Sequence, residues 1–382
     1  MSRAFQPYAH PLRSPTYSVG GQDAISFEGM PTRIFGRIAH MIGLMIQYSV
    51  TGTASTAPTV VGQHSVIRSL VFYDGVNERA NLSLFDLRSF EILENGVLQL
   101  PDSPIIASAS PTVVTRYLPL GPQGFEGNPT DFAMPVAALK SGELRLNFGA
   151  LTDWSADCSA LTMNSFTISA ILVPIDNELR LPPAFERRSF NYGTTEAMIQ
   201  GKALYTTVAI TKQDNTVFTT GQLGTVSWDS GSGQAPTLTT GQLTAIAQYF
   251  TLSTHVGQLT GDPVNAGQTG LRSVNATTPT ALETAPGYMQ SVVTSPEDSR
   301  ITKLIVESTA ALRIRWSGSF ATPKVLVGRI LEQPLTAYGT IGSRASQALG
   351  LQVVTSRVKT LDKTAYRGPR ELYMPMAAKV AA

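Results

Sequence analysis

The longest apolar segment of the chain runs from Ile34 to Val50, and its pattern constrains the fold more than any other feature. From position 38 onward the odd positions are small or mixed, whereas the even positions are large, and these are Ile38, His40, Ile42, Leu44, Ile46, Tyr48 and Val50. This period of two, together with two glycines that a helix interior would penalise, favours a long and largely buried β-strand. Ile38, Ile42 and Ile46 also fit a helical stripe, so a buried helix is the alternative. The segment is too short and too polar to span a bilayer, which needs about 18 or more apolar residues.

A second strand and a short helix are predicted next along the chain. A Thr/Ser/Ala/Pro-rich connector, residues 51–58, leads to a β-rich run over residues 66–75 that closes with an Asp-Gly turn. Residues 82–96 then have apolar side chains at helical spacing and end in Asn-Gly, which favours a helix stop. Ser83 is the candidate N-cap, with Asp86 three residues later in the position of a capping box.

This order of a long apolar strand, a Thr/Ala-rich connector, a strand ending in aromatic-Asp-Gly and a Leu-rich helix resembles a known family. It is similar to the amino-terminal half of the double jelly-roll major capsid proteins of tailless icosahedral bacteriophages, typically ones with an internal membrane. The resemblance covers roughly residues 27–177, and the rest of the chain is similar only in its length and its general composition. It implies an all-β fold with two jelly-roll β-barrels in tandem, short helices and terminal arms.

The resemblance also implies a function and a set of partners. The chain would be a structural coat protein, not an enzyme, and would need no cofactor. Its copies would form homotrimers of pseudo-hexagonal outline that tile an icosahedral shell. The expected partners are neighbouring trimers, minor capsid and vertex proteins, and an internal lipid membrane where one is present. The expected location is the virion, after synthesis in the host cytoplasm.

Composition agrees with a protein that is covered by neighbours. Charged residues make up 15% of the 382 residues, against about 25% in typical proteins, and interface cores are depleted in charge. An extracellular or cell-wall β protein can have the same composition and remains an alternative.

The net charge of +2 gives no basic field of the kind that marks a dedicated nucleic-acid binder. The single thiol, Cys158, forms no internal bridge, and the first residues lack the apolar core of a signal peptide.

Turn-forming residues and changes in composition divide the chain into five parts. The predicted parts are an N-terminal arm (1–23), a first jelly roll (24–176), a linker (177–199), a second jelly roll (200–334) and a basic C-terminal arm (335–382). Long Gly/Pro/Thr-rich stretches at 121–131 and 219–286 are predicted to form exposed loops.

The C-terminal arm concentrates positive charge, with seven cations against Asp362 and Glu371, a net charge of +5. The seven are the candidate residues for contact with other subunits or with a membrane: Arg344, Arg357, Lys359, Lys363, Arg367, Arg370 and Lys379. A weak helical stripe of Leu and Val beside them would suit an acidic partner or a lipid surface. A solvated tail that docks on its own domain is the alternative.

The sequence offers no catalytic, cofactor-binding or metal-binding constellation. Its four histidines share no metal-ligand spacing, and no phosphate-binding loop or nucleophile elbow is present. Glu143, Asp153 and Asp157 flank Trp154, which would suit a glycosidase, and Trp228 and Trp316 could be further sugar-stacking platforms. A secreted or surface carbohydrate-binding or carbohydrate-active β-sandwich protein is therefore the alternative function.

Overall fold

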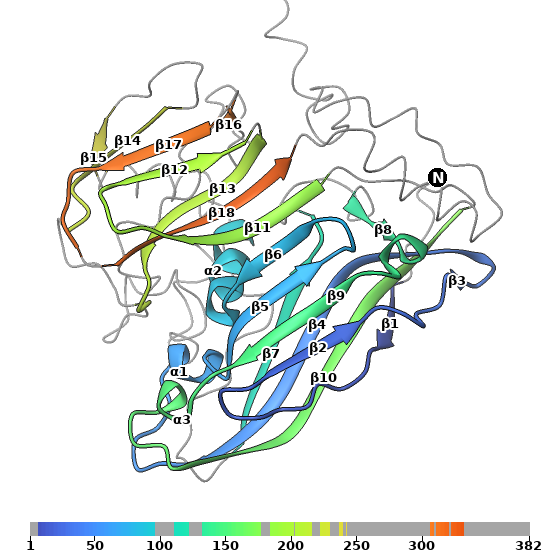
Figure 1. Cartoon of the computed structure of the whole chain (residues 1–382). Helices are drawn as coiled ribbons and strands as arrows, with labels where there is room; N and C mark the ends of the chain where they lie inside the picture. The colour runs from blue at the N-terminus through green and yellow to red at the C-terminus, as the bar shows by residue number, and fades with distance from the viewer. Residues whose placement is uncertain are drawn as a thin grey trace, which may run out of the picture.

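The computed structural model describes residues 7–95, 111–121, 132–176, 184–201, 203–215, 222–229, 237–239, 242, 306–308, 311–320 and 322–331. These residues form an all-β molecule with a few short helices, arranged as two lobes (Figure 1). We call the described residues of 7–176 the first lobe and those of 184–331 the second lobe.

The first lobe contains a sheet built around the long apolar segment. Its central strand β4 (Arg37–Thr53) pairs along one edge with β10 (Ala160–Ile175), and the two run side by side through the lobe in Figure 1. The other strands of this sheet are β1 (Tyr8–Pro11), β3 (Arg33–Ile34), β7 (Thr112–Pro119) and β8 (Met134–Pro135).

A second sheet of eight strands extends from the first lobe into the second. Its strands, in spatial order, are β16 (Val306–Ser308), β13 (Ala203–Lys212), β18 (Pro323–Leu331), β11 (Ala184–Asn191), β6 (Glu78–Leu82), β5 (Ile67–Tyr73), β9 (Glu143–Phe148) and β2 (Gln22–Ser26). A third sheet completes the second lobe, with the order β12 (Glu196–Gln200), β17 (Ala311–Trp316), β14 (Thr225–Asp229) and β15 (Leu238–Thr239). The described short helices are α1 (Val60–His64), α2 (Leu84–Asn95), the 3-10 helix η2 (Val136–Leu139) and α3 (Leu151–Trp154).

The predicted strand is confirmed from Arg37 onward as β4, and the helical alternative is excluded. Its first residues differ, because Ile34 belongs to β3 and residues 35–36 form the turn between the two strands. From Leu44 to Gly52 the even positions are buried, whereas Gln47 on the opposite face is exposed. One expected core residue differs: Ile42 is only half-buried. A β-bulge explains this difference, because Met41 pairs with Leu172 and Gly43 with Ile171, which leaves Ile42 opposite no residue of β10.

The helix predicted after the second strand is also confirmed, with the expected capping box. The Ser83 backbone N–H donates to the Asp86 carboxylate, and the Asp86 N–H donates to the Ser83 hydroxyl, both at 3.0 Å. These two bonds satisfy donors at the start of α2 that have no partner within the helix.

Several predicted boundaries lie differently in the structure. Residues 8–11 of the predicted N-terminal arm form β1, and β2 begins at Gln22. Within the predicted linker, residues 184–191 form β11 and residues 196–199 belong to β12. The predicted loop at 121–131, apart from Gly121, and the whole C-terminal arm lie outside the described residues. The segment at 219–286 is not loop throughout, because its described residues include β14 and β15, and Val226 of β14 is buried in the core of the second lobe.

Each lobe has its own apolar core, and the first core reaches across the boundary. The core of the second lobe is lined by β12, β13, β14, β17 and β18. The core of the first lobe includes Leu84, Leu87 and Phe90 of α2, together with Ala209 and Leu326 from strands of the second lobe. Apolar packing therefore links the lobes in addition to their shared sheet.

Candidate functional site at the junction of the two lobes

Strand β11 joins the two lobes by pairing with a strand from each. It runs antiparallel to β18 of the second lobe from Ala184 to Asn191, and parallel to β6 of the first lobe at Arg187 and Arg188. Because backbone hydrogen bonds run across this boundary, the eight-stranded sheet contains strands of both lobes. A hinge between them would require those bonds to break.

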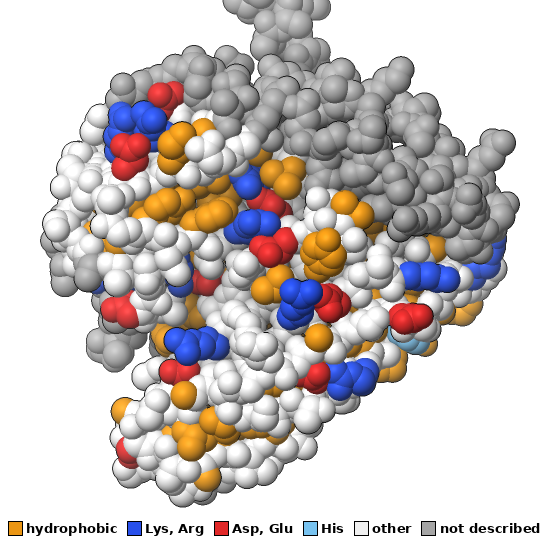
Figure 2. Space-filling view, in the orientation of Figure 1, with side chains coloured by type: hydrophobic (Ala, Val, Ile, Leu, Met, Phe, Trp, Pro, Cys, Tyr) orange, Lys and Arg blue, Asp and Glu red, His pale blue; other side chains and the backbone are white. Residues whose placement is uncertain are grey.

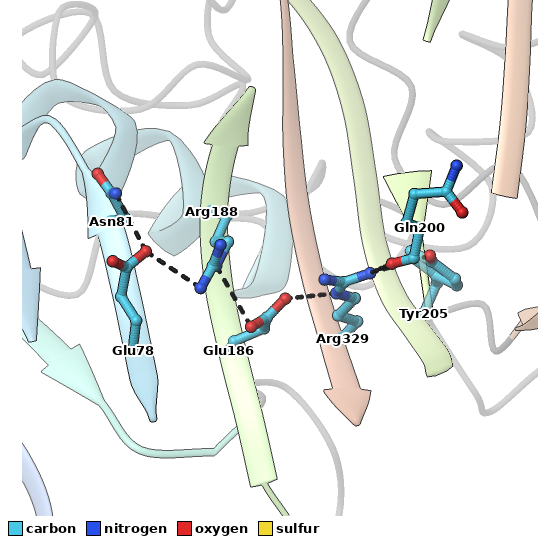
Figure 3. Close-up of polar contacts among 7 residues, drawn as sticks. All are labelled: Glu78, Asn81, Glu186, Arg188, Gln200, Tyr205 and Arg329. Carbon is cyan, nitrogen blue, oxygen red and sulfur yellow. Dashed lines mark hydrogen bonds and ion pairs between the residues drawn. The ribbon is translucent and has the colours of Figure 1, made fainter. Parts of the chain in front are cut away.

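A chain of charged side chains crosses the same boundary (Figure 3). Arg188 on β11 forms ion pairs with Glu78 of β6 at 3.1 Å and with Glu186 at 3.3 Å. Glu186 also pairs with Arg329 of β18, which donates to the Gln200 carbonyl at 2.6 Å. The network therefore extends from the first lobe through β11 into the second.

The central pair of this network is buried. Glu186 is 2% exposed and Arg329 is 7% exposed. Burial opposes a charged guanidinium, yet the Glu186 carboxylate raises the pKa of Arg329 above its usual value, with the Tyr205 hydroxyl 3.3 Å away adding to the effect. Charges this deeply buried are retained only when their partners are correctly placed. The pair therefore fixes the lateral position of β18 against β11.

A second buried ion pair connects the lobes beside α2. The Lys324 ammonium lies 2.6 Å from the Asp86 carboxylate and 2.6 Å from the Asn215 side-chain oxygen. Asp86 belongs to the capping box of α2, so the same carboxylate starts a helix of the first lobe and binds a strand of the second.

Arg187 supplies a third connection. Its guanidinium donates to the Pro119 carbonyl at 2.5 Å and to the Gly121 carbonyl at 2.7 Å, where β7 ends. It also lies over the Phe185 ring, 4.6 Å from the ring centroid, and near the Phe90 ring at 6.0 Å. A planar, always charged group that binds carbonyls and stacks on aromatic rings suits a buried contact better than lysine would.

The seven cations predicted from the sequence lie in the C-terminal arm, outside the described residues. The sequence pattern does not reveal the junction residues, because Glu186, Arg187 and Arg188 lie in the segment predicted to be a linker. A usable signal was present in β18, where Arg329 interrupts an apolar strand. A cation inside such a run requires a buried partner elsewhere in the chain.

The described residues offer little support for a carbohydrate site. Trp154 and Trp316 are 1% and 3% exposed, so neither ring can stack on a sugar. Two of the three acids near Trp154 in the sequence hold loops, and Glu143 instead pairs with Arg145 on β9. Asp157 accepts from the Ser55 and Thr56 N–H groups, and hydrogen bonds, led by that from the Ser55 hydroxyl, lower its pKa to about 2. Among the residues described, no group of three or more His, Cys, Asp or Glu side chains could hold a metal ion. In the same part of the chain, no helix is both long and apolar enough to cross a membrane.

Comparisons with known proteins define the fold. No protein-family model and no curated protein matches this sequence. Solved structures do match. The major capsid protein of Sulfolobus turreted icosahedral virus has a TM-score of 0.52 at 10% identity, covering 85% of this chain and 97% of that one. VP54 of PBCV-1, fitted into a reconstruction of the virophage Sputnik, has a TM-score of 0.51 at 8% identity, covering 86% and 95%.

Both neighbours are double jelly-roll proteins, and their lengths are matched almost completely. The chain described here shares that double jelly-roll fold, with the all-β architecture predicted from its sequence.

Proposed function

We propose that this chain is a major capsid protein whose copies form trimers that tile an icosahedral virion shell. The observation that carries the proposal is the junction: two jelly-roll lobes share one sheet through β11. A subunit that contributes two lobes to a flat tile must hold them at a fixed angle, because any hinge would spoil the outline of the trimer. The double jelly-roll fold, shared with viral capsid proteins, supports the same function.

The described surface suits a protein that is packed among copies of itself. In Figure 2 the described atoms are mostly uncharged, and the cations and anions form small mixed groups without a large basic patch. Such a face matches protein–protein contacts better than nucleic-acid binding, which needs concentrated positive charge. The proposed partners are therefore neighbouring trimers, with minor capsid and vertex proteins at specialised positions of the shell. The virion is the proposed location, after synthesis in the host cytoplasm.

We expect the purified full-length protein to be a homotrimer that resists dilution. Obligate interfaces between subunits are large and apolar, so the trimer should persist at low protein concentration. Multi-angle light scattering across a dilution series measures the mass directly. A monomer mass at every concentration would contradict the capsid proposal.

The C-terminal arm is proposed to act in shell closure and not in folding. A chain ending at Thr336 is expected to fold and trimerise but to fail to build closed shells. Exposed cations add little to the stability of their own domain, since lone surface pairs contribute about 0–1 kcal/mol. Repeated over many copies, they can bind an acidic lipid surface with about 1 kcal/mol per Lys or Arg, an interaction that salt weakens.

Size exclusion and electron microscopy of the truncated and full-length chains across a salt series test this role. A full-length variant with the seven cations changed to glutamine is the matched control, because it separates charge from length. The difference in the yield of closed shells between the truncated and the full-length chain should become smaller as the salt concentration rises. Loss of the trimer on truncation would place the arm in the fold, and unimpaired shells would show that the arm is dispensable.

A further inference from the structure

The hairpin between β3 and β4 has an unusual residue at its tip. Arg33 pairs with Ile38 and Ile34 with Arg37, which leaves Phe35 and Gly36 as a two-residue turn. Both turn residues have positive φ, 51° for Phe35 and 76° for Gly36. This is the pattern of a type I′ turn, whose preferred sequence is Asn-Gly because asparagine and glycine tolerate left-handed backbone.

Phe35 is unfavourable for the isolated subunit in two respects. A bulky aromatic residue rarely adopts positive φ, because its Cβ crowds the backbone. Its side chain is also 73% exposed, more than any other large hydrophobic residue in the part of the chain that is described. A single exposed apolar side chain is ordinary at a protein surface, but one held on a strained turn stabilises nothing within the lobe. A contact outside the subunit is therefore the simplest reason for a phenylalanine here.

The polar groups around the ring are already engaged. Arg33 donates to the Gly36 carbonyl at 3.1 Å, within its own turn, and Arg37 pairs with Asp176 at 3.3 Å. The tip therefore presents an aromatic ring with a satisfied polar rim, which is the anatomy of a protein–protein hot spot. A lipid or nucleic-acid contact would instead need cations that are not engaged within the subunit.

We propose that Phe35 is an anchor residue that inserts into a second copy of this chain. This inference rests on the proposed capsid function, which supplies identical neighbours at high local density. The ring becomes buried in the contact between copies, and the strained turn presents it rigidly, because a two-residue hairpin loop allows little movement.

Phe35→Asn separates assembly from folding, since it creates the preferred Asn-Gly turn and removes the ring. We expect the thermal midpoint of the subunit to stay unchanged or to rise. The protein concentration needed for assembly of the full-length chain should increase about tenfold or more, the effect of losing a hot-spot side chain. Val19→Asn is the matched control, because it removes another exposed apolar side chain, 46% exposed, and should leave that concentration unchanged.

Photo-crosslinking identifies the partner. The full-length protein carrying p-benzoylphenylalanine at position 35 should give a covalent product of twice the chain mass, whereas the same group at position 19 should not. If the wild-type chain does not assemble, both the capsid proposal and this inference are overturned. If it assembles and Phe35→Asn assembles equally well, or if Phe35→Asn lowers binding to anionic vesicles alone, only this inference is overturned.

Discussion

Replacing Lys324 with methionine is expected to destabilise the protein by about 3–5 kcal/mol, because it leaves the buried Asp86 carboxylate without its cation. The two side chains are 6% and 3% exposed and lie 2.6 Å apart. They join the second lobe to the first, so the loss should also loosen the two lobes relative to each other. Urea unfolding gives the change in free energy, and hydrogen exchange at β11 and β18 reports the junction.

A double-mutant cycle with Asp86→Asn tests whether the effect belongs to the pair. Asparagine keeps an oxygen that can accept from the Ser83 N–H and cap α2, but it carries no charge. The double variant should therefore be more stable than Lys324→Met alone. Arg313→Met is the surface control: Arg313 pairs with Glu196 at 3.0 Å, both are about 40% exposed, and its loss should cost at most about 1 kcal/mol. Equal effects of the buried and surface changes would refute this account of the junction.

Ile46→Asp is expected to unfold the first lobe. Ile46 is fully buried in β4, opposite Ile168 of β10 on one side and Arg116 of β7 on the other. The Arg116 guanidinium already donates to the His64 ring at 3.0 Å and to the Thr115 carbonyl at 2.8 Å, so a new carboxylate could pair with it only by breaking those bonds. Such a burial costs several kcal/mol, out of a total stability of about 5–15 kcal/mol for a typical domain. Circular dichroism and the soluble yield on expression report the loss.

The adjacent residue provides the matched control for that change. Gln47 is exposed on the opposite face of the same strand, so Gln47→Asp should change the stability by no more than about 1 kcal/mol. A soluble Ile46→Asp variant with an unchanged melting midpoint would show that this face of β4 is not part of the core.

Strands with a clean pattern were predictable from the sequence. The alternating apolar segment forms β4 from Arg37 onward, and the capping box of α2 has the predicted partners. In both cases the information lies within a few neighbouring residues, where side-chain period and hydrogen-bonding groups determine the local structure.

The junction could not be predicted, because its stability depends on residues far apart in the chain. Strand β11 contains Glu186, Arg187 and Arg188, and such a charged run has low strand propensity when considered alone. Its first four residues are buried, and there Arg329 supplies the charge opposite to Glu186 from 143 positions away. Elsewhere in the junction, Asp86 of α2 meets Lys324 of β18 from 238 positions away. The sequence alone does not show which of these distant residues come into contact in the folded chain.

The prediction that Ile42 is a core residue was wrong for a related reason. The alternation of apolar residues continues through Ile42 without any break in the sequence, yet the register with β10 shifts there. Register is a property of two strands, so one strand alone does not reveal where it slips.

Electron microscopy of the purified full-length protein is the most direct test of the central claim, that two rigidly joined jelly-roll lobes form the tile of a virion shell. We expect trimers of pseudo-hexagonal outline and, at higher protein concentration, closed particles or facet fragments built from them. A field of single two-lobed monomers at every concentration would contradict it.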